Sequence, residues 1–347
     1  MSENIKFIKD GGIVLGRNFT CDGFYWDEDD YESSPKYRIQ THAHEDHMAQ
    51  FERSKRFQNK GIICTNPTKD LLVMKRKGNL SIFNGFITLE DNEKKEIGNE
   101  ILEVRDANHI IGTIQVKVTL SDGKSIGYSS DFYWPCDPIK VDELVVDSTY
   151  GDPKSIMKYN PADIEKQFVE IALAPNKTQI VMGHRGRIQY CLSNLLYGNC
   201  NKPIYATQNV RDTCKVYEKY GFPMPEIRKL EDETSIEEIE KIPSLVFMHS
   251  SEWRQFPWYN EYTKIILSAY MQRNQSGITE HSDGGFTIPI TDHADFLGTL
   301  NYIKATGARI VYPYGNDGGN SIALARYINE EMEGVDAVIL EPEDVRI

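Results

Sequence analysis

The sequence predicts a mixed α/β protein in two parts, a strand-rich domain formed by both chain ends and a smaller α/β domain inserted between them. The first half alternates short apolar runs with turn signals, as strands do. The middle alternates strand-like runs with helical segments, which is typical of a parallel sheet. The chain then returns to a strand-like run. We therefore assign 1–156 and 284–347 to the first domain and 157–283 to the insertion.

The elements of the first half follow from local patterns. A Ser121-Asp122-Gly123 turn separates two of the apolar runs, and a proline stands early in each of two helical segments. We expect helices over 66–78 and 161–173, and strands over 11–16, 36–41, 61–65, 81–89, 100–107, 114–120, 125–130 and 143–149.

The second half also alternates strand-like runs with helical segments, which are recognised by the same periodic patterns. We expect strands over 178–183, 203–207, 244–250, 286–290, 308–314 and 337–342. The helices expected between them cover 188–197, 208–220, 294–306 and 319–333.

Composition narrows the class of protein. The 347 residues are 40% hydrophobic, an ordinary globular value. No apolar run approaches the roughly 18 residues that span a bilayer, and the N-terminus lacks a secretory signal, so we expect a cytoplasmic protein without a membrane partner. Six scattered cysteines without a C-x-x-C pair argue against a disulfide framework or a cysteine zinc site. A net charge of -13 disfavours coating of nucleic acid but leaves room for a nuclease with bound cations.

The segment Thr41-His42-Ala43-His44-Glu45-Asp46-His47 carries the strongest functional signal. It places three of the eight histidines of the chain beside an aspartate, directly after a strand-like run. Imidazole and carboxylate groups are ligands for zinc and other first-row metals. A solvated polar loop is the structural alternative, and the density of ligand residue types makes it the weaker explanation.

This H-x-H-x-D-H pattern resembles the signature of the metallo-β-lactamase superfamily. In that family a histidine, an aspartate and a distant histidine follow in order, each at the end of a strand. His109 in Asn108-His109, Asp131 after Ser129-Ser130 and His293 in Thr291-Asp292-His293 match those places. Singly, each is weak, because a lone histidine is more often a structural residue; the ordered set is strong.

The resemblance implies a four-layer αββα sandwich and two divalent metal ions, zinc first and manganese as the alternative. It assigns one metal to His42, His44 and His109, the other to Asp46, His47 and His293, with Asp131 as the bridge. Two such cations can share a hydroxide and clamp a displacement. Asp46 and Asp131 would orient that hydroxide, and His293 could serve the leaving oxygen.

Further motifs resemble the β-CASP branch of this superfamily, whose members cleave nucleic acids. Asp147 ends an apolar strand before Ser148-Thr149-Tyr150, and it matches an acidic motif of the branch; it could hydrogen-bond a metal-ligating histidine. Gly186-Arg187-Ile188-Gln189 resembles the start of the branch's inserted domain, at the position where composition predicts an insertion. The resemblance implies DNA-repair or RNA-processing partner proteins.

One position departs from the branch. Tyr314 stands where RNA-cleaving members carry a histidine. Tyrosine can donate a hydrogen bond but does not carry a proton at neutral pH as imidazole does. DNA-specific members also lack this histidine, so the departure favours DNA over RNA. The short insertion resembles the ligase-associated DNA exonucleases most closely, although those usually keep the histidine.

Several side chains could bind substrate or could have a purely structural role. Arg187 could bind a phosphate oxygen or be a surface arginine, and Ser148 and Thr149 could line a phosphate pocket or form a turn. His184 could face a cleft. The aromatic residues Trp253, Trp258 and Tyr259 could stack on bases, but a core role is favoured.

We therefore expect a metal-dependent phosphodiesterase that acts on nucleic acid, with DNA exonuclease activity as the first hypothesis. An RNA-processing nuclease of the same branch is the nearest alternative. The same ligands would serve a metallohydrolase of a thioester, lactone or cyclic phosphodiester, which the acidic net charge fits slightly better. A non-catalytic partner subunit is disfavoured, because the ligand set is complete.

Overall fold

The chain folds into two compact units, which we describe separately. A computed structural model describes residues 4–9, 11–75, 83–175, 177–230, 233–256, 258, 261–269, 277–315 and 320–343. The first unit comprises Met1–Ser155 with His293–Ile347, and the second comprises Ile156–Asp292. The described residues contain no helix with both the length and the hydropathy needed to cross a bilayer.

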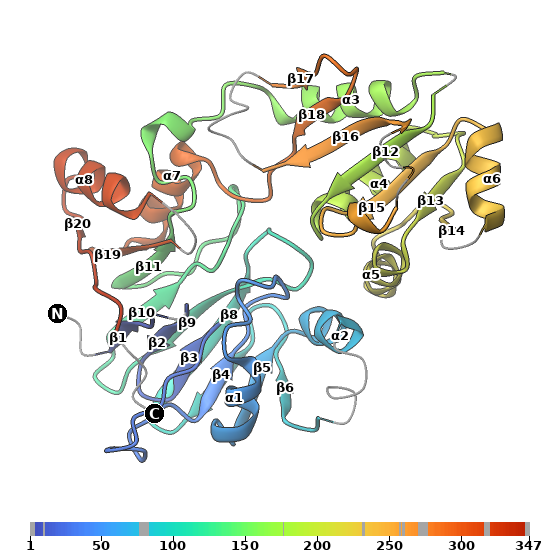
Figure 1. The fold of residues 1–347 in the computed structure, drawn as a ribbon. Coiled ribbons are helices and arrows are strands. Elements are labelled where there is room, and N and C mark those ends of the chain that lie inside the picture. Colours follow the sequence, from blue (N-terminus) through green and yellow to red (C-terminus); the bar gives the residue numbers. More distant parts are fainter. Residues whose placement is uncertain are drawn as a thin grey trace. The chain divides into compact units, whose positions relative to one another are not determined.

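The first unit contains two mixed sheets (Figure 1). In the first sheet, β1, β2 and β3 are antiparallel and β3 to β6 are parallel. Its strands in spatial order are β1 (Ile5–Phe7), β2 (Ile13–Leu15), β3 (Phe19–Cys21), β4 (Tyr37–Ile39), β5 (Gly61–Cys64) and β6 (Phe86–Thr88).

The second sheet joins strands from both ends of the chain. From one edge it runs β20 (Asp336–Ala337), β19 (Ile310–Tyr314), β11 (Glu143–Asp147), β10 (Ser125–Tyr128), β9 (Ile114–Thr119), β8 (Glu100–Asp106) and β7 (Lys94–Ile97). The neighbours from β10 to β20 are parallel, and those from β7 to β10 are antiparallel. The carboxyl ends of β10, β11 and β19 therefore lie along one edge, where their following loops meet.

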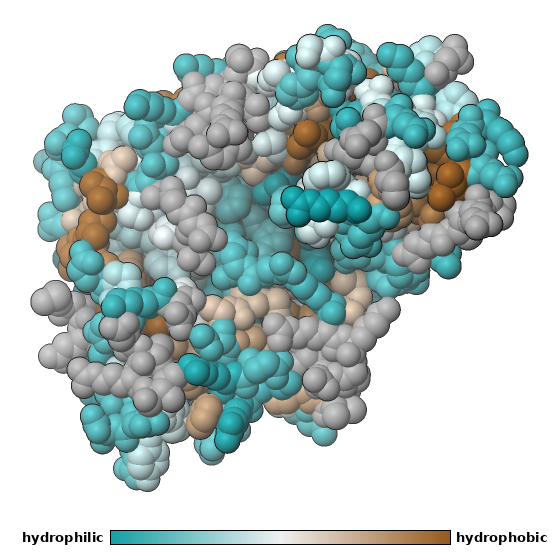
Figure 2. All heavy atoms as spheres, in the orientation of Figure 1, coloured by the Kyte–Doolittle hydropathy of each residue, from teal (hydrophilic) through white to brown (hydrophobic). Residues whose placement is uncertain are grey.

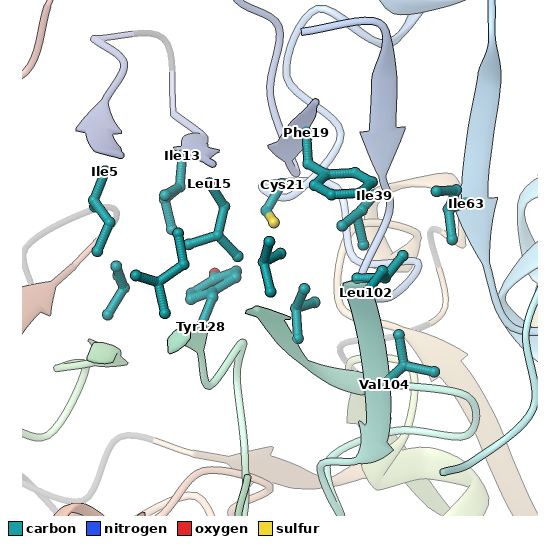
Figure 3. Close-up of a cluster of buried hydrophobic side chains, with 14 of the residues drawn as sticks. Ile5, Ile13, Leu15, Phe19, Cys21, Ile39, Ile63, Leu102, Val104 and Tyr128 are labelled. Carbon is teal, nitrogen blue, oxygen red and sulfur yellow. The ribbon is translucent and has the colours of Figure 1, made fainter. Parts of the chain in front are cut away.

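The core of this unit lies between the two sheets. Figure 3 shows Leu15 of the first sheet pointing toward Tyr128 of the second sheet, and Phe19 and Ile39 belong to the same buried cluster. Helices α1 (Phe51–Phe57) and α2 (Asn66–Lys75) contact the first sheet, whereas α7 (Phe296–Thr306) and α8 (Ser321–Glu331) contact the second. A short 3-10 helix, η1, covers Pro153–Ser155. This confirms the predicted α+β sandwich, with helices outside two packed sheets.

The second unit contains one largely parallel sheet. Its order is β14 (Arg228–Lys229), β13 (Ile204–Ala206), β15 (Leu245–His249), β12 (Gln179–Gly183), β16 (Thr263–Ser268), β18 (Phe286–Pro289) and β17 (Thr279–Glu280). Only the pairing of β17 with β18 is antiparallel within this described sheet. Apolar residues of α3 (Pro161–Ala172), α4 (Arg187–Tyr197) and α5 (Gln208–Lys219) form one core cluster, and a second cluster includes α6 (Glu233–Lys241).

Most expected elements are present with shorter bounds. Asn160 caps α3, as the Asn-Pro signal indicates: its side chain accepts a hydrogen bond from the backbone N–H of Ala162. The helix expected over 66–78 is described to Lys75, and 76–78 lie outside the described residues.

Two expectations at the end of the chain differ from the structure. The run 286–290, expected in the first domain, forms β18 and pairs with β16 in the second unit. The strand expected over 337–342 is reduced to β20, which pairs only briefly with β19. The periodicity also does not reveal β1 and β7, which pair with the next strands along the chain, β2 and β8, or β16, which pairs with the distant β12.

The face shown in Figure 2 is mostly hydrophilic, as the net charge of -13 leads one to expect. Hydrophobic atoms gather over α8 at the left of the view, and Ile322 of this helix is 69% exposed. Isolated exposed apolar residues are common on globular proteins, so this feature does not by itself indicate a binding site.

Candidate metal centre

The loop between β4 and α1 carries the histidine-rich segment, and polar side chains from the end of β4 and the start of the loop hold it in place. Arg38 is fully buried and donates hydrogen bonds to the carbonyl oxygens of His47 and Ala49. Gln40 donates from Nε2 to the carbonyl oxygens of His42 and His47. These contacts satisfy the carbonyls of a buried loop that has no regular partner strand. They fix the direction in which its side chains project.

A first group of donor atoms comes from three histidines. Nδ1 of His44 lies 3.2 Å from Nε2 of His42 and 3.1 Å from Nε2 of His109. Oδ2 of Asp131 lies 3.6 Å from Nε2 of both His42 and His109. The structure thus gathers four side chains from three separate loops, with atoms that could hold one metal ion.

A second group lies on the other side of Asp131. Its Oδ1 is 3.3 Å from Nε2 of His47, and its Oδ2 is 3.7 Å from Nε2 of His293. Oδ2 of Asp46 lies 3.7 Å from Nε2 of His47, on a side chain that is 48% exposed. Asp131 therefore faces both groups: its Oδ2 lies near His42, His109 and His293, and its Oδ1 lies near His47.

Outer hydrogen bonds set the tautomers of these imidazoles. The hydroxyl of Thr41 donates to Asp22, so its oxygen accepts from Nδ1 of His42 at 3.0 Å. Nδ1 of His47 lies 2.9 Å from Oδ2 of Asp22, and Nδ1 of His293 lies 3.0 Å from Oδ2 of Asp147. A proton on each Nδ1 leaves Nε2 with its lone pair directed at the centre, as in metal-binding histidines.

The donor set fits a divalent metal pair. Ligand atoms 2.0–2.1 Å from a tetrahedral zinc ion are about 3.3 Å apart, close to the 3.1 and 3.2 Å spacings around His44. Lone pairs of several imidazoles and a carboxylate repel one another at such distances unless a cation lies between them. The residues present therefore match one cation in the first group and a second beside Asp46 and His47.

The pKa values of several side chains in these two groups are strongly shifted. Burial, reinforced by the neighbouring His47, lowers the pKa of His42 well below 6.5. For His47, burial acts to lower the pKa, but the charges of Asp131 and Asp22 outweigh it and raise the pKa well above 6.5. For Asp131, burial acts to raise the pKa, yet His47 and His293 hold it well below 3.8. A cation bound beside His47 would replace the proton that this histidine otherwise holds.

Tight turns position the ligands that follow the strands of the second sheet. His109 follows β8 in a turn where Asn108 has φ 54° and Gly112 has φ 82°. A Cβ on Gly112 would lie 2.6 Å from Oγ1 of Thr65, so this position requires glycine. Ser130, with φ 56°, turns the chain between β10 and Asp131.

A pocket of about 200 Å³ opens beside the second donor group. Two tyrosines, Tyr128 and Tyr314, line it together with Asp46, His47, Asp131, Asp147, Thr149 and His293. Tyr314, predicted to contact substrate, is one of the residues that line this pocket. Tyr128 has no recognisable signal in the sequence, because it reads as an ordinary apolar strand residue of SIGYSS.

The other residues predicted to bind substrate have partners of their own. The hydroxyl and backbone N–H of Thr149 both donate to Oδ1 of Asp147, although Thr149 still lines the pocket. Ser148 is fully buried with its hydroxyl 2.8 Å from that of Ser321, which favours the turn role over the phosphate pocket. In the second unit, Nε and one terminal nitrogen of Arg187 lie 3.0 Å from Oδ1 of Asp292.

The second unit also contains the remaining histidine and aromatic candidates. His184 packs edge-on against His249, with ring centroids 5.0 Å apart. Trp258 packs against Phe256 and Tyr262, which fits the core role favoured from the sequence. Trp253 is 37% exposed, and Tyr259 lies outside the described residues.

Sequence reasoning missed Asp22, the partner of both Thr41 and His47. It is 4% exposed and has φ 56°, a conformation that asparagine and aspartate adopt more readily than most residues. Its place directly after β3, before Gly23, reads as an ordinary turn. Only the pairing of β3 with β4 brings it beside the histidine loop.

Comparison with known proteins gives partial matches. No protein-family model matches the chain. The chain is 30% identical over 134 residues to a protein of Acidianus ambivalens described as "Uncharacterized protein in lig 3'region", a match that covers 37% of this chain and 94% of that protein. It is 28% identical over 154 residues to an "RNase J-like protein" of Methanocaldococcus jannaschii, covering 38% of this chain and 35% of that protein. The chain thus spans about a third of this second relative's length.

The fold has a counterpart among solved structures. The crystal structure of a protein of unknown function from Enterococcus faecalis V583 superposes with a TM-score of 0.61. The match covers 98% of this chain and 97% of that one at 12% sequence identity. At this identity the likeness concerns the fold alone.

Proposed function

The chain belongs to the family of the Acidianus ambivalens lig 3′-region protein, and we propose that it is a metal-dependent phosphodiesterase that cleaves nucleic acid. The observation that carries the proposal is the convergence of imidazole nitrogens from His42, His109 and His293 on one carboxylate, Asp131. The order of these residues along the chain supports membership of the metallo-β-lactamase superfamily and its β-CASP branch, with the second unit as the inserted domain. The RNase J-like relative supports nucleic acid as the substrate class.

In this proposal His42, His44 and His109 hold one divalent cation, zinc first and manganese second. Asp46, His47 and His293 hold the other, and Asp131 lies between them. When bound, such a pair lowers the pKa of water to about 7 and neutralises charge on a phosphate.

The chain's own groups orient the reaction. Asp46 and Asp131 would accept hydrogen bonds from the attacking water and hold it in line with the phosphorus. Asp22 and Asp147 keep the Nδ1 protons of His47 and His293 in place, so that both rings stay oriented. The sequence suggested that His293 serves the leaving oxygen. With Nδ1 engaged by Asp147 and Nε2 directed at the centre, His293 has no nitrogen left for that task.

The finer substrate class is open to direct test. Tyr314 in place of a histidine favours DNA, with exonuclease action as the first expectation, whereas the name of the RNase J-like relative favours RNA. The deciding experiment compares end-labelled single- and double-stranded DNA and RNA, with zinc or manganese added. Labels at either end report the polarity of cleavage and separate exonuclease from endonuclease products.

The matched variants are Asp46→Ala and Asp142→Asn. Asp142 is an exposed aspartate of the same unit that accepts hydrogen bonds from Ser125, outside the donor groups. We expect Asp46→Ala to lose at least about 100-fold in rate and Asp142→Asn to keep it. Equal degradation by wild type and Asp46→Ala would reveal a contaminant and overturn the assignment.

A small-molecule hydrolase would use the same ligands, and salt separates the two activities. Binding of a nucleic acid through several phosphates weakens steeply with added salt, roughly in proportion to the number of contacts. Activity on a lactone or thioester that exceeds the nuclease activity and ignores salt would favour the alternative.

A further inference from the structure

Tyr128 is a buried tyrosine whose hydroxyl has no acceptor among the described residues. It ends β10, is 1% exposed and packs its ring into the core between the two sheets (Figure 3). It also lines the pocket beside Asp131. Burying a hydroxyl without a partner costs free energy, so a group of this kind has a ligand or a water to bond with.

Tyr314 lines the same pocket from the end of β19. Its hydroxyl oxygen accepts a hydrogen bond from the backbone N–H of Gly12 at 2.9 Å. That contact fixes the phenol and uses only its oxygen, so its proton is still available for donation into the pocket. The rings of Tyr128 and Tyr314 lie 6.1 Å apart, edge to face.

The other residues that line the pocket have little to donate. Asp46, Asp131 and Asp147 are carboxylates and only accept. The hydroxyl proton of Thr149 goes to Asp147. His47 and His293 donate from Nδ1 to Asp22 and Asp147 and direct Nε2 at the proposed cations. The two tyrosine hydroxyls are therefore the hydrogen-bond donors that this pocket presents to a ligand.

We propose that Tyr128 and Tyr314 together donate hydrogen bonds to oxygens of the phosphate group that the metal centre cleaves. This inference rests on the proposed function and names how its site recognises phosphate. The carboxylates of Asp46, Asp131, Asp147 and the adjacent Asp22 carry -4, and two bound divalent cations would cancel this charge and its repulsion of an anion. A phosphate has four oxygens around one atom, so it can contact the cations and both hydroxyls at once, whereas a carboxylate offers two.

The tyrosine pair could also serve the leaving oxygen, for which His293 has no nitrogen left. A tyrosine hydroxyl can stabilise charge on that oxygen by donating a hydrogen bond without giving up its proton. Burial, with the nearby Asp22 and Asp131, raises the pKa of Tyr128 well above 10, which keeps this donor protonated.

The test compares Tyr128→Phe and Tyr314→Phe with a matched control, Tyr302→Phe. Tyr302 is fully buried in the same unit, but its hydroxyl donates to Oε1 of Gln115 at 2.6 Å. Each protein is loaded with zinc and its zinc content is measured. Affinities for inorganic phosphate and for acetate are then determined by calorimetry, and thermal unfolding is recorded for each variant.

We expect both pocket variants to bind phosphate about 10-fold more weakly or worse, with acetate affinity and zinc content unchanged. The midpoint of thermal unfolding is a second readout, because it distinguishes a hydroxyl that binds ligand from one that stabilises the fold. Tyr128→Phe removes a hydroxyl without a described acceptor, so its midpoint should be unchanged or higher. Tyr302→Phe should bind phosphate normally and unfold about 2–4 °C lower.

Two results would overturn the inference: Tyr128→Phe binding phosphate within twofold of wild type, or the same variant losing stability as Tyr302→Phe does. The experiment distinguishes failure of this inference from failure of the proposed function. Nuclease activity in wild type with unchanged phosphate binding by Tyr128→Phe refutes the hydroxyl pair alone. Tyrosine-dependent phosphate binding without any nuclease activity supports the pair and refutes the nucleic acid substrate.

Discussion

Replacement of Asp22 by asparagine tests the outer support of the metal centre. Oδ2 of Asp22 accepts from the hydroxyl of Thr41 at 2.6 Å and lies 2.9 Å from Nδ1 of His47. An asparagine can keep its oxygen on the backbone N–H of Thr41, which donates to Oδ1 at 2.8 Å. Its amide nitrogen then faces Nδ1 of His47, and two donors cannot share that contact. His47 must move its proton to Nε2, where it blocks the proposed cation.

The magnitude follows from the bond that is lost. A hydrogen bond to a charged group contributes about 1.5–3 kcal/mol, which corresponds to about 10–150-fold in an equilibrium constant. Loss of an outer carboxylate from a metal-binding histidine typically costs about 10–100-fold in metal affinity. We therefore expect at least one of two zinc ions to bind at least about 10-fold more weakly in Asp22→Asn.

The assay is a competition between the protein and a zinc chelator, with the tautomer of His47 followed by nitrogen NMR. Asp142→Asn serves as the control, because Asp142 is an exposed aspartate whose hydrogen bonds go to Ser125. Two zinc equivalents bound to Asp22→Asn with wild-type affinity, and an unchanged tautomer, would refute the reasoning.

Three further predictions concern metal and stability. Zinc at about 100 times its dissociation constant should stabilise the wild type by about 2.7 kcal/mol, seen as a higher unfolding midpoint that a chelator reverses; a midpoint insensitive to both would contradict a metal centre. Gly112→Ala should destabilise by about 1–3 kcal/mol and weaken zinc binding, because its Cβ would meet Thr65, whereas Gly123→Ala, with nothing within 4 Å, should cost only its positive φ and leave zinc binding intact. Arg38→Met should lower the free energy of unfolding by about 3 kcal/mol or more in denaturant titration, because buried carbonyls of the histidine loop lose their donor; a loss below about 1 kcal/mol would show that the loop is held by other contacts.

Local patterns predicted much of the fold. Alternating apolar runs predicted β8 to β11, and periodic apolar residues with a proline near the start predicted α3, because both signals arise within a few neighbouring residues. The short strands β1 and β7 carried no such signal. They exist through pairing with β2 and β8, which a linear pattern does not record.

The candidate site was likewise predictable in part from the sequence. Ligand residue types are conspicuous in a sequence, so the histidine loop stood out by itself, whereas His109, Asp131 and His293 were identified through the resemblance to the metallo-β-lactamase superfamily. The structure brings their donor atoms within about 4 Å of Asp131 or His44.

The sequence by itself determined which residues have ligand chemistry and many of the short segments that form strands and helices. Only the tertiary structure decided that Asp22 supports His47, that β18 belongs to the second unit, and that Tyr128 lines the pocket. The physical reason is the range of the interactions. Periodicity and turn chemistry act over a few residues, whereas strand pairing and buried hydrogen bonds join groups that are adjacent only after the chain has folded.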